Sequence, residues 1–177
     1  AEIIKKNNLI VIADEIYADL VYEKHEHLSI GSLPDMKSRT LTLNGFSKTY
    51  AMTGWRIGYI AGPLDIISKM TEIRHALSIN SCTFSQYGAI AALEGPQDDL
   101  LKMKEEYNIR RKFCMHSLQA MGLSYGEPGG AFYIYTNVST SGMKATDFSE
   151  QLLKKTGVLL FPGTLFGDEE DKYIRLS

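Results

Sequence analysis

Hydrophobic residues form short continuous blocks in the first part of the chain, and each block ends at polar residues. Residues 9–13 form a mainly β-branched run that ends at Asp14 and Glu15, and residues 40–45 form a second, shorter run, in which Thr and Leu alternate, that leads into residues 46–48. Continuous apolar runs of this length are typical of strands that are buried on both faces of a parallel sheet. Functional groups gather at the carboxyl ends of such strands, so we expect the chemistry to lie where these two runs end.

The blocks that follow alternate between strand and helix patterns. Residues 56–62 predict a third strand, and residues 64–77 and 84–93 carry apolar positions at helical spacing. An alternation of strands and helices indicates an α/β fold. Gly95 and Pro96 then interrupt the pattern, and we expect a domain boundary at this break.

A different pattern begins after the break. An apolar stripe along residues 98–121 predicts one long charged helix, which is long enough to connect two domains. The expected organisation is therefore one domain in residues 1–95 and a small α+β domain in residues 96–177. Within the small domain we expect strands at 130–135, 157–161 and 172–176 and an amphipathic helix at 145–156.

The composition excludes several functional classes. The 177 residues are 44% hydrophobic, enough for a buried core, and the net charge of −2 leaves no basic surface for nucleic acid. The two cysteines, Cys82 and Cys114, have neither the spacing of a disulfide framework nor that of a metal site. No apolar stretch is long enough for a membrane span. We therefore expect a cytoplasmic protein with no metal, membrane or nucleic-acid partner.

The most specific segment of the chain is NGFSKTYAMTGWRIGY, residues 44–59. It closely resembles the lysine signature of class I/II aminotransferases, fold-type I enzymes that use pyridoxal 5'-phosphate (PLP). The resemblance implies that Lys48 is the catalytic residue and forms a Schiff base with PLP, and that Ser47 and Arg56 bind the cofactor phosphate. The residue types suit these roles, because an amine condenses with an aldehyde and a guanidinium offers a planar fork of donors to phosphate. Outside this context, Lys48 would be interpreted as a solvated surface lysine.

A second element, Asp14-Glu15-Ile16-Tyr17, follows the first strand and resembles the D-E-x-Y element of the same family. By resemblance, Asp14 pairs with the cofactor's ring nitrogen and Tyr17 donates its hydroxyl to the phenolic oxygen. A carboxylate suits the first role, because it raises the pKa of the nitrogen and keeps the ring an electron sink. Taken alone, Asp14 would be a helix N-cap. Glu15 and Asp19 are interpreted as solvated or structural residues.

A third element, YIRLS at residues 173–177, follows a P-G-x-x-F-G turn at residues 162–167. In the family, the arginine of this strand binds the α-carboxylate of the substrate, and Arg175 matches it. A bidentate contact of this kind orients the amino acid for reaction. The alternative for Arg175 is an ordinary salt bridge within a strand. His25 and His27 lack a third ligand at a suitable spacing, so we interpret them as surface residues and not as metal ligands.

The resemblance covers residues 9–177 and corresponds to the C-terminal portion of a family member. It implies that residues 1–95 are part of a large PLP-binding domain with a mixed, mainly parallel sheet. Both ends look cut, so we expect a fragment in which residues 1–95 expose a sheet edge and apolar surface. The expected function of the parent protein is transfer of an amino group from an L-amino acid to a 2-oxo acid, with PLP as the cofactor, in a homodimer. Two alternatives stay open, a PLP-dependent carbon–sulfur lyase and a catalytically silent fragment that only self-associates. The identity of the amino-acid donor does not follow from these residues.

Overall fold

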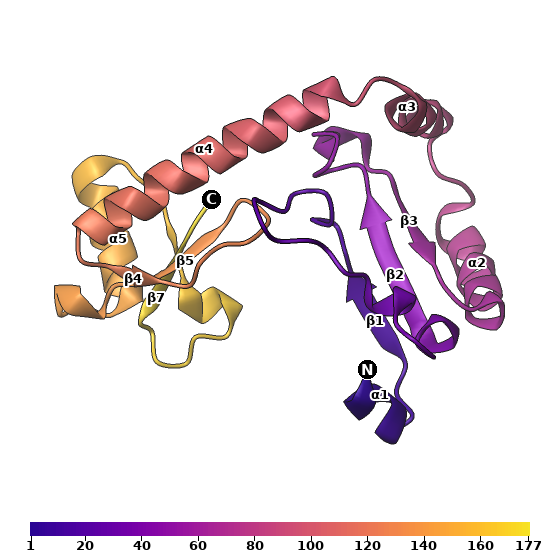
Figure 1. Cartoon of the computed structure of the whole chain (residues 1–177), viewed down its shortest axis with the longest axis horizontal. Helices are drawn as coiled ribbons and strands as arrows, with labels where there is room; N and C mark the ends of the chain where they lie inside the picture. Colours follow the sequence, from indigo (N-terminus) through magenta and orange to yellow (C-terminus); the bar gives the residue numbers. More distant parts are fainter. The chain divides into compact units, whose positions relative to one another are not determined.

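The computed structural model describes all 177 residues, which form two compact units, Ala1–Leu101 and Lys102–Ser177 (Figure 1). The boundary between the units lies inside helix α4 (Asp98–Ala120), which agrees closely with the long helix expected at residues 98–121. The observed boundary therefore lies a few residues after Gly95 and Pro96, which is where the sequence predicts a domain boundary. The reason is that the Gly-Pro break ends a helix, whereas the first turn of α4 still belongs to the first unit.

The first unit is built on a mixed three-stranded sheet with the order β1-β2-β3. The strands are β1 (Val11–Asp14), β2 (Thr40–Gly45) and β3 (Gly58–Ala61). β1 pairs with β2 in parallel, and β3 pairs with β2 antiparallel (Figure 1). β2 lies in the middle and contains the buried strand residues, whereas every residue of β3 is exposed. The prediction of a mixed α/β sheet is confirmed.

The helices of the first unit are α1 (Glu2–Lys6), α2 (Leu64–Ser78) and α3 (Thr83–Glu94). The sequence predicts α2 and α3 to within one residue at each end, but not α1. No residue of α2 is buried, and Leu64 and Leu77 are 81% and 82% exposed. The side chain of Ile12 on the edge strand β1 is 69% exposed. The expectation that this part of the chain exposes a sheet edge and apolar surface is therefore confirmed.

Two glycines face each other where β2 pairs with β3. Gly45 is the register partner of Gly58. A Cβ atom on Gly58 would lie 2.9 Å from the carbonyl oxygen of Asn44, and one on Gly45 would lie 3.1 Å from Cα of Gly58. Real Cβ atoms essentially never show a contact as short as that of Gly58, and few show one as short as that of Gly45, so the close approach of the two backbones depends on the absence of both side chains.

The second unit contains a four-stranded antiparallel sheet with the order β4-β5-β7-β6. Helix α5 (Ala145–Thr156) matches the predicted range, and Val138, Ala145 and Ile174 form a buried core with which Phe148 packs. The strands are β4 (Ser124–Tyr125), β5 (Ile134–Asn137), β6 (Phe161–Pro162) and β7 (Tyr173–Leu176).

Two strand predictions in this unit are wrong at their starts. The strand expected at residues 130–135 begins only at Ile134, because Ala131 has a positive φ of 57° and belongs to a turn. The strand expected at residues 157–161 is reduced to Phe161 and Pro162, because Gly157 adopts a left-handed conformation that ends α5. Short strands that follow turns are therefore the least predictable part of this fold.

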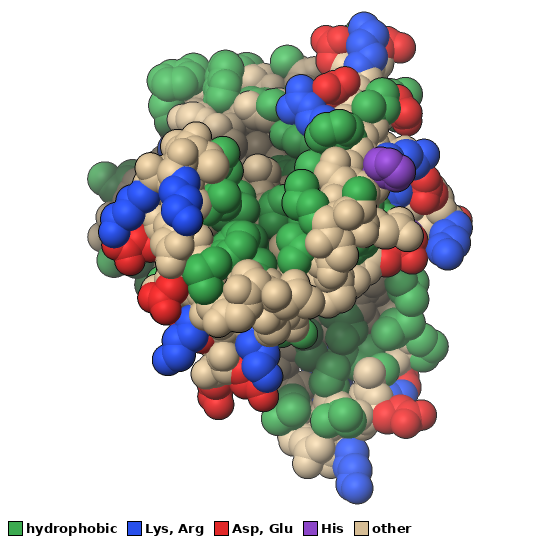
Figure 2. All heavy atoms as spheres, turned by 90° about the vertical axis from the view of Figure 1, so that its left-hand side faces the viewer, with side chains coloured by type: hydrophobic (Ala, Val, Ile, Leu, Met, Phe, Trp, Pro, Cys, Tyr) green, Lys and Arg blue, Asp and Glu red, His purple; other side chains and the backbone are tan.

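Charged side chains of both signs are scattered over the face drawn in Figure 2, and apolar side chains also reach the surface there. This distribution agrees with a net charge of −2 and with charges spread along the chain. None of the helices combines the length and the apolar character that a membrane crossing requires.

Candidate active site

Lys48 lies in the connection between β2 and β3, in a turn fixed by its own backbone. The carbonyl oxygen of Phe46 accepts hydrogen bonds from the N–H groups of Tyr50 and Met52, at 3.2 and 3.3 Å. The N–H of Phe46 donates to the carbonyl oxygen of Ile57 at 3.4 Å, and its side chain is 5% exposed. One buried residue therefore anchors both ends of the segment that carries Lys48.

Ser47 and Arg56 lie in the same connection. Ser47 is half-buried beside Lys48, and Arg56 directly follows the 3-10 helix η3 (Thr53–Trp55). Arg56 has a left-handed backbone, with φ 51° and ψ 49°, and its Nη1 donates to the carbonyl oxygen of Thr53 at 2.8 Å. A left-handed residue other than glycine costs about 1–2 kcal/mol, and such strain is found preferentially at functional sites.

Asp14 is the last residue of β1, and it pairs in register with Leu43 of β2. Because the two strands are parallel, Asp14 and the Lys48 turn both lie at the carboxyl ends of the strands, on the same side of the sheet. Oδ1 of Asp14 accepts a hydrogen bond from the N–H of Ile16 at 3.2 Å, and residues 16–19 form turns. No α-helix begins at this position, so the helix N-cap alternative is wrong. Tyr17 is half-buried within this turn.

The side chain of Glu15 is largely buried and forms hydrogen bonds, which its sequence context does not suggest. Its side chain is 9% exposed, and its carboxylate bonds to Nε2 of His27 at 2.9 Å and to Oγ of Ser29 at 2.7 Å. Burial alone would raise the pKa of Glu15, but the hydrogen bonds from His27 and Ser29 outweigh it and hold the pKa below the ordinary 4.5. Glu15 is therefore a structural residue, and His27 is its partner rather than an isolated surface histidine.

A further contact connects the two motifs of the first unit. Oγ1 of Thr49 donates a hydrogen bond of 2.9 Å to Oδ2 of Asp19. Thr49 follows Lys48 directly, and Asp19 lies two residues after Tyr17. Sequence reasoning did not identify this contact, because thirty positions separate the partners and the motifs assign no role to either residue.

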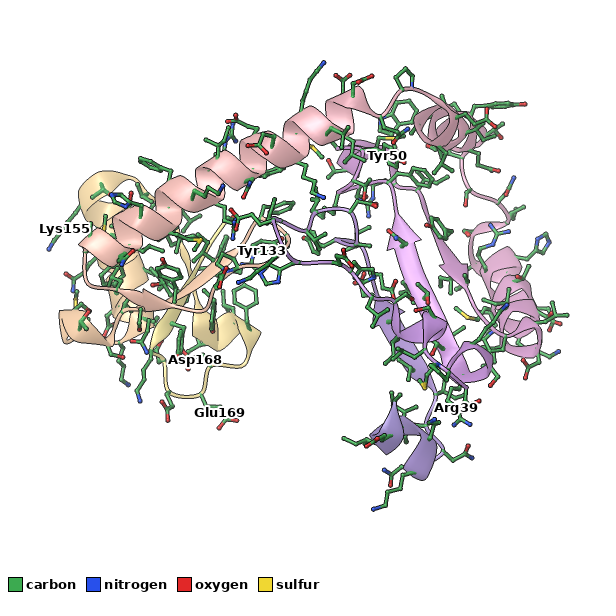
Figure 3. All side chains as sticks on the ribbon, in the orientation of Figure 1. Arg39, Tyr50, Tyr133, Lys155, Asp168 and Glu169 are labelled. Atoms are coloured by element: carbon green, nitrogen blue, oxygen red, sulfur yellow. The ribbon has the colours of Figure 1, made fainter.

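Arg175 lies on β7 in the second unit, within a group of aromatic rings. Its Cζ atom is 3.9 Å from the ring centre of Phe166, 4.6 Å from that of Tyr133 and 5.8 Å from that of Phe161. Tyr133 is labelled in Figure 3. Nε of Arg175 is buried without a hydrogen-bond partner, and the residue forms no ion pair within this chain. Stacking on a ring stabilises a guanidinium while its in-plane N–H groups stay available for a carboxylate.

The strand that carries Arg175 is anchored by Asp168 (Figure 3). The carboxylate of Asp168 accepts hydrogen bonds from the backbone N–H groups of Lys172 at 2.7 Å, Tyr173 at 2.8 Å and Glu170 at 3.2 Å. Desolvation raises the pKa of Asp168, but these three hydrogen bonds together lower it below 3.8. The approach to β7 is thus fixed two residues before Arg175.

The predicted site residues are therefore divided between the two units. Asp14, Tyr17, Ser47 and Lys48 belong to the first unit, together with Arg56, on segments that leave one edge of one sheet or connect its strands. Arg175 belongs to the second unit. Each unit carries its part of the predicted site on regular secondary structure or on turns fixed by hydrogen bonds.

The fold and the arrangement of these segments define the class of protein. A structure of an aromatic aminotransferase from Pyrococcus horikoshii OT3 superposes with a TM-score of 0.94 at 40% identity, covering 99% of this chain and 48% of that one. An N-succinyldiaminopimelate aminotransferase structure from Mycobacterium tuberculosis gives a TM-score of 0.92 at 26% identity, covering 100% of this chain and 47% of that one. The fold is therefore that of PLP-dependent aminotransferases.

The chain belongs to the aminotransferase class I and II family, which matches residues 1–177. It is 42% identical over 177 residues to a putative aminotransferase, YugH, of Bacillus subtilis, and 41% identical over 179 residues to an aspartate aminotransferase of Pyrococcus abyssi. Each alignment covers 100% of this chain and 46% of the relative. The resemblance found in the sequence is thus confirmed, and the chain spans about half the length of these relatives.

Proposed function

We propose that the protein containing this chain is an aminotransferase that moves an amino group from an L-amino acid to a 2-oxo acid. The observation that carries the proposal is the shared sheet edge of Asp14 and the Lys48 turn, in a chain of the aminotransferase class I and II family. Relatives named as aspartate and aromatic aminotransferases support the reaction class but not one particular donor. Residues 1–95 would belong to the large domain and residues 96–177 to the small domain of a cytoplasmic homodimer.

The donor set of the first unit fits PLP. Lys48 supplies an amine for the aldehyde, and Ser47 with Arg56 supplies a hydroxyl and a guanidinium for the phosphate. Oδ2 of Asp14 has no hydrogen-bond partner, so this exposed carboxylate is available for a protonated ring nitrogen. Tyr17 would donate its hydroxyl to the phenolic oxygen. When bound, PLP supplies an aldehyde for the substrate amine and a ring that withdraws electrons from the substrate α-carbon.

The protein's own groups then have separate roles. The Lys48 amine would take the proton from the substrate α-carbon and return it during transfer. Asp14 would keep the ring nitrogen protonated by placing a negative charge beside it. Arg175 would bind the α-carboxylate in the plane of its guanidinium, with Phe166 limiting the orientations of that plane.

The test is amino-group transfer by the full-length protein. Incubation with PLP, a panel of L-amino acids and 2-oxoglutarate should form glutamate, with stoichiometric conversion of one donor to its 2-oxo acid. Lys48→Ala should lower kcat by more than about a thousandfold, because it removes both the covalent attachment and the proton carrier. Release of pyruvate and ammonia without glutamate would indicate the carbon–sulfur lyase instead. Absence of any turnover with a PLP-loaded protein would refute both enzymatic assignments.

A further inference from the structure

The hydrogen bond between Thr49 and Asp19 joins two turns that come from neighbouring parallel strands. Asp19 ends the turn that follows β1, and Thr49 lies in the turn that follows β2. The ladder between these strands determines where each turn begins, because Asp14 pairs with Leu43. It does not determine where the tips of the turns lie, so the relative position of the tips depends on the side-chain hydrogen bond between them.

The burial of Thr49 makes this bond costly to lose. Thr49 is 2% exposed, so its hydroxyl has no alternative partner in solvent. A buried hydroxyl without a partner has lost its hydrogen bonds to water and forms no hydrogen bond within the protein to replace them, which is unfavourable. The acceptor Oδ2 belongs to an exposed aspartate, and bonds to a carboxylate are about twice as strong as bonds between neutral groups.

Tyr50, the next residue of the lysine turn, is also held in place. Its ring stacks on Phe46 with centroids 5.6 Å apart, and its position is labelled in Figure 3. Burial raises the pKa of the Tyr50 hydroxyl, and the nearby charge of Asp19 raises it further. The hydrogen bond between Thr49 and Asp19 and the stacking of Tyr50 on Phe46 therefore hold the two residues that follow Lys48.

We propose that Thr49 and Asp19 are positioning residues for Lys48, and that their hydrogen bond sets the lysine turn against the turn that carries Tyr17. The inference rests on the proposed function, which assigns the chemistry to Lys48. Proton transfer depends on geometry, and a displacement of about 1 Å can reduce the rate about a hundredfold. Neither residue touches the reacting atoms in this proposal. Both act through the position of the lysine.

The first experiment removes the hydroxyl of Thr49 and then restores it. In the full-length protein loaded with PLP, Thr49→Val keeps a branched side chain but should lower kcat about tenfold to a hundredfold, with KM for the amino acid changed less than about threefold. Thr49→Ser restores the donor and should stay within about threefold of wild type. The control is Thr71→Val on α2, whose hydroxyl bonds to the carbonyl oxygen of Ile67 in its own helix, and it should leave both constants unchanged.

The second experiment does not depend on activity. Amide hydrogen exchange of Tyr50 and Met52, measured in the full-length protein without PLP, reports how firmly the lysine turn is held. Thr49→Val and Asp19→Ala should each accelerate this exchange about tenfold or more, whereas Asp19→Asn, which keeps an acceptor, should accelerate it less. Asp19 is exposed, so its variants provide the same test if Thr49→Val does not fold.

A double variant then decides whether the two residues act together. If they act through one bond, Thr49→Val combined with Asp19→Ala should lose no more than the worse single variant. Additive losses would overturn the proposal, and so would wild-type exchange and kcat in Thr49→Val. A wild-type protein that transfers no amino group would instead refute the proposed function, while the exchange data would still decide whether the turn is held by this pair.

Discussion

Replacing Gly163 with alanine tests how closely the turn before Arg175 is packed. Gly163 begins the 3-10 helix η5 (Gly163–Phe166), and a Cβ atom on it would overlap the hydroxyl of Tyr135. The same atom would lie 2.8 Å from Cβ of Asp168. The φ angle of Gly163 is not positive, so backbone strain plays no part and the cost of the substitution is steric.

Neither neighbour can move away easily. Tyr135 stacks on Tyr173, with ring centroids 5.0 Å apart and planes 5° apart. Asp168 is held by three backbone N–H groups of the segment that leads into β7. Overpacking a well-packed site costs about 1–3 kcal/mol, and two simultaneous overlaps place Gly163→Ala at about 2–3 kcal/mol of lost stability.

The assay is urea unfolding of the full-length protein, with stability taken from the midpoint at an unchanged m-value. Gly126→Ala is the matched control, because a Cβ there meets nothing within 4 Å and should change stability by less than about 0.5 kcal/mol. Tyr135→Phe removes the overlapping hydroxyl and should recover at least half of the loss in the double variant. A Gly163→Ala protein as stable as wild type would refute this reasoning, and so would a loss that Tyr135→Phe leaves unchanged.

Two further predictions concern buried polar contacts. Burial raises the pKa of Glu15 but the bonds from His27 and neighbouring donors lower it more, so the folded pKa lies below 4.5. The stabilisation is therefore present above about pH 4.5 and lost as the pH falls through the folded value, and Glu15→Gln should flatten this acid dependence in urea titrations. Arg111 is 7% exposed and donates to the carbonyl oxygen of Pro128 at 3.0 Å, so Arg111→Met should cost about 1.5–3 kcal/mol in the same assay. Arg110→Met removes an exposed arginine and should cost less than about 0.5 kcal/mol, and equal losses for the two arginines would contradict the role of burial.

The parts of the fold that could be predicted are those with a strong local pattern. β2 and α5 match their predicted ranges because the alternating Thr-Leu pattern of residues 40–43 and the amphipathic stripe of residues 145–156 each persist over several residues. β5 and β6 begin later than predicted, because left-handed residues at Ala131 and Gly157 prolong the turns before them. Positive φ at an alanine has no reliable signature in a single sequence.

Residues of the candidate site could be proposed from the sequence where they occupy defined positions of a family motif, as Lys48 and Asp14 do. The residues that support them could not be predicted in the same way. Glu15 stands in a motif, but its partner His27 is twelve positions away and resembles an ordinary surface residue until the chain is folded. The stacking of Arg175 on Phe166 likewise depends on how η5 returns toward β7, which no local pattern encodes.

The pair of facing glycines in the first unit has a practical consequence for engineering. Under the proposed function, libraries that aim to change substrate preference would randomise positions around Lys48. Gly45 and Gly58 should be kept fixed in such libraries, because any side chain there would push apart the two strands from which the connection carrying Lys48 emerges. Variation at these two positions should therefore destabilise the sheet itself, whereas a Cβ on exposed Gly54, in the same connection, would meet nothing within 4 Å and should leave the sheet intact.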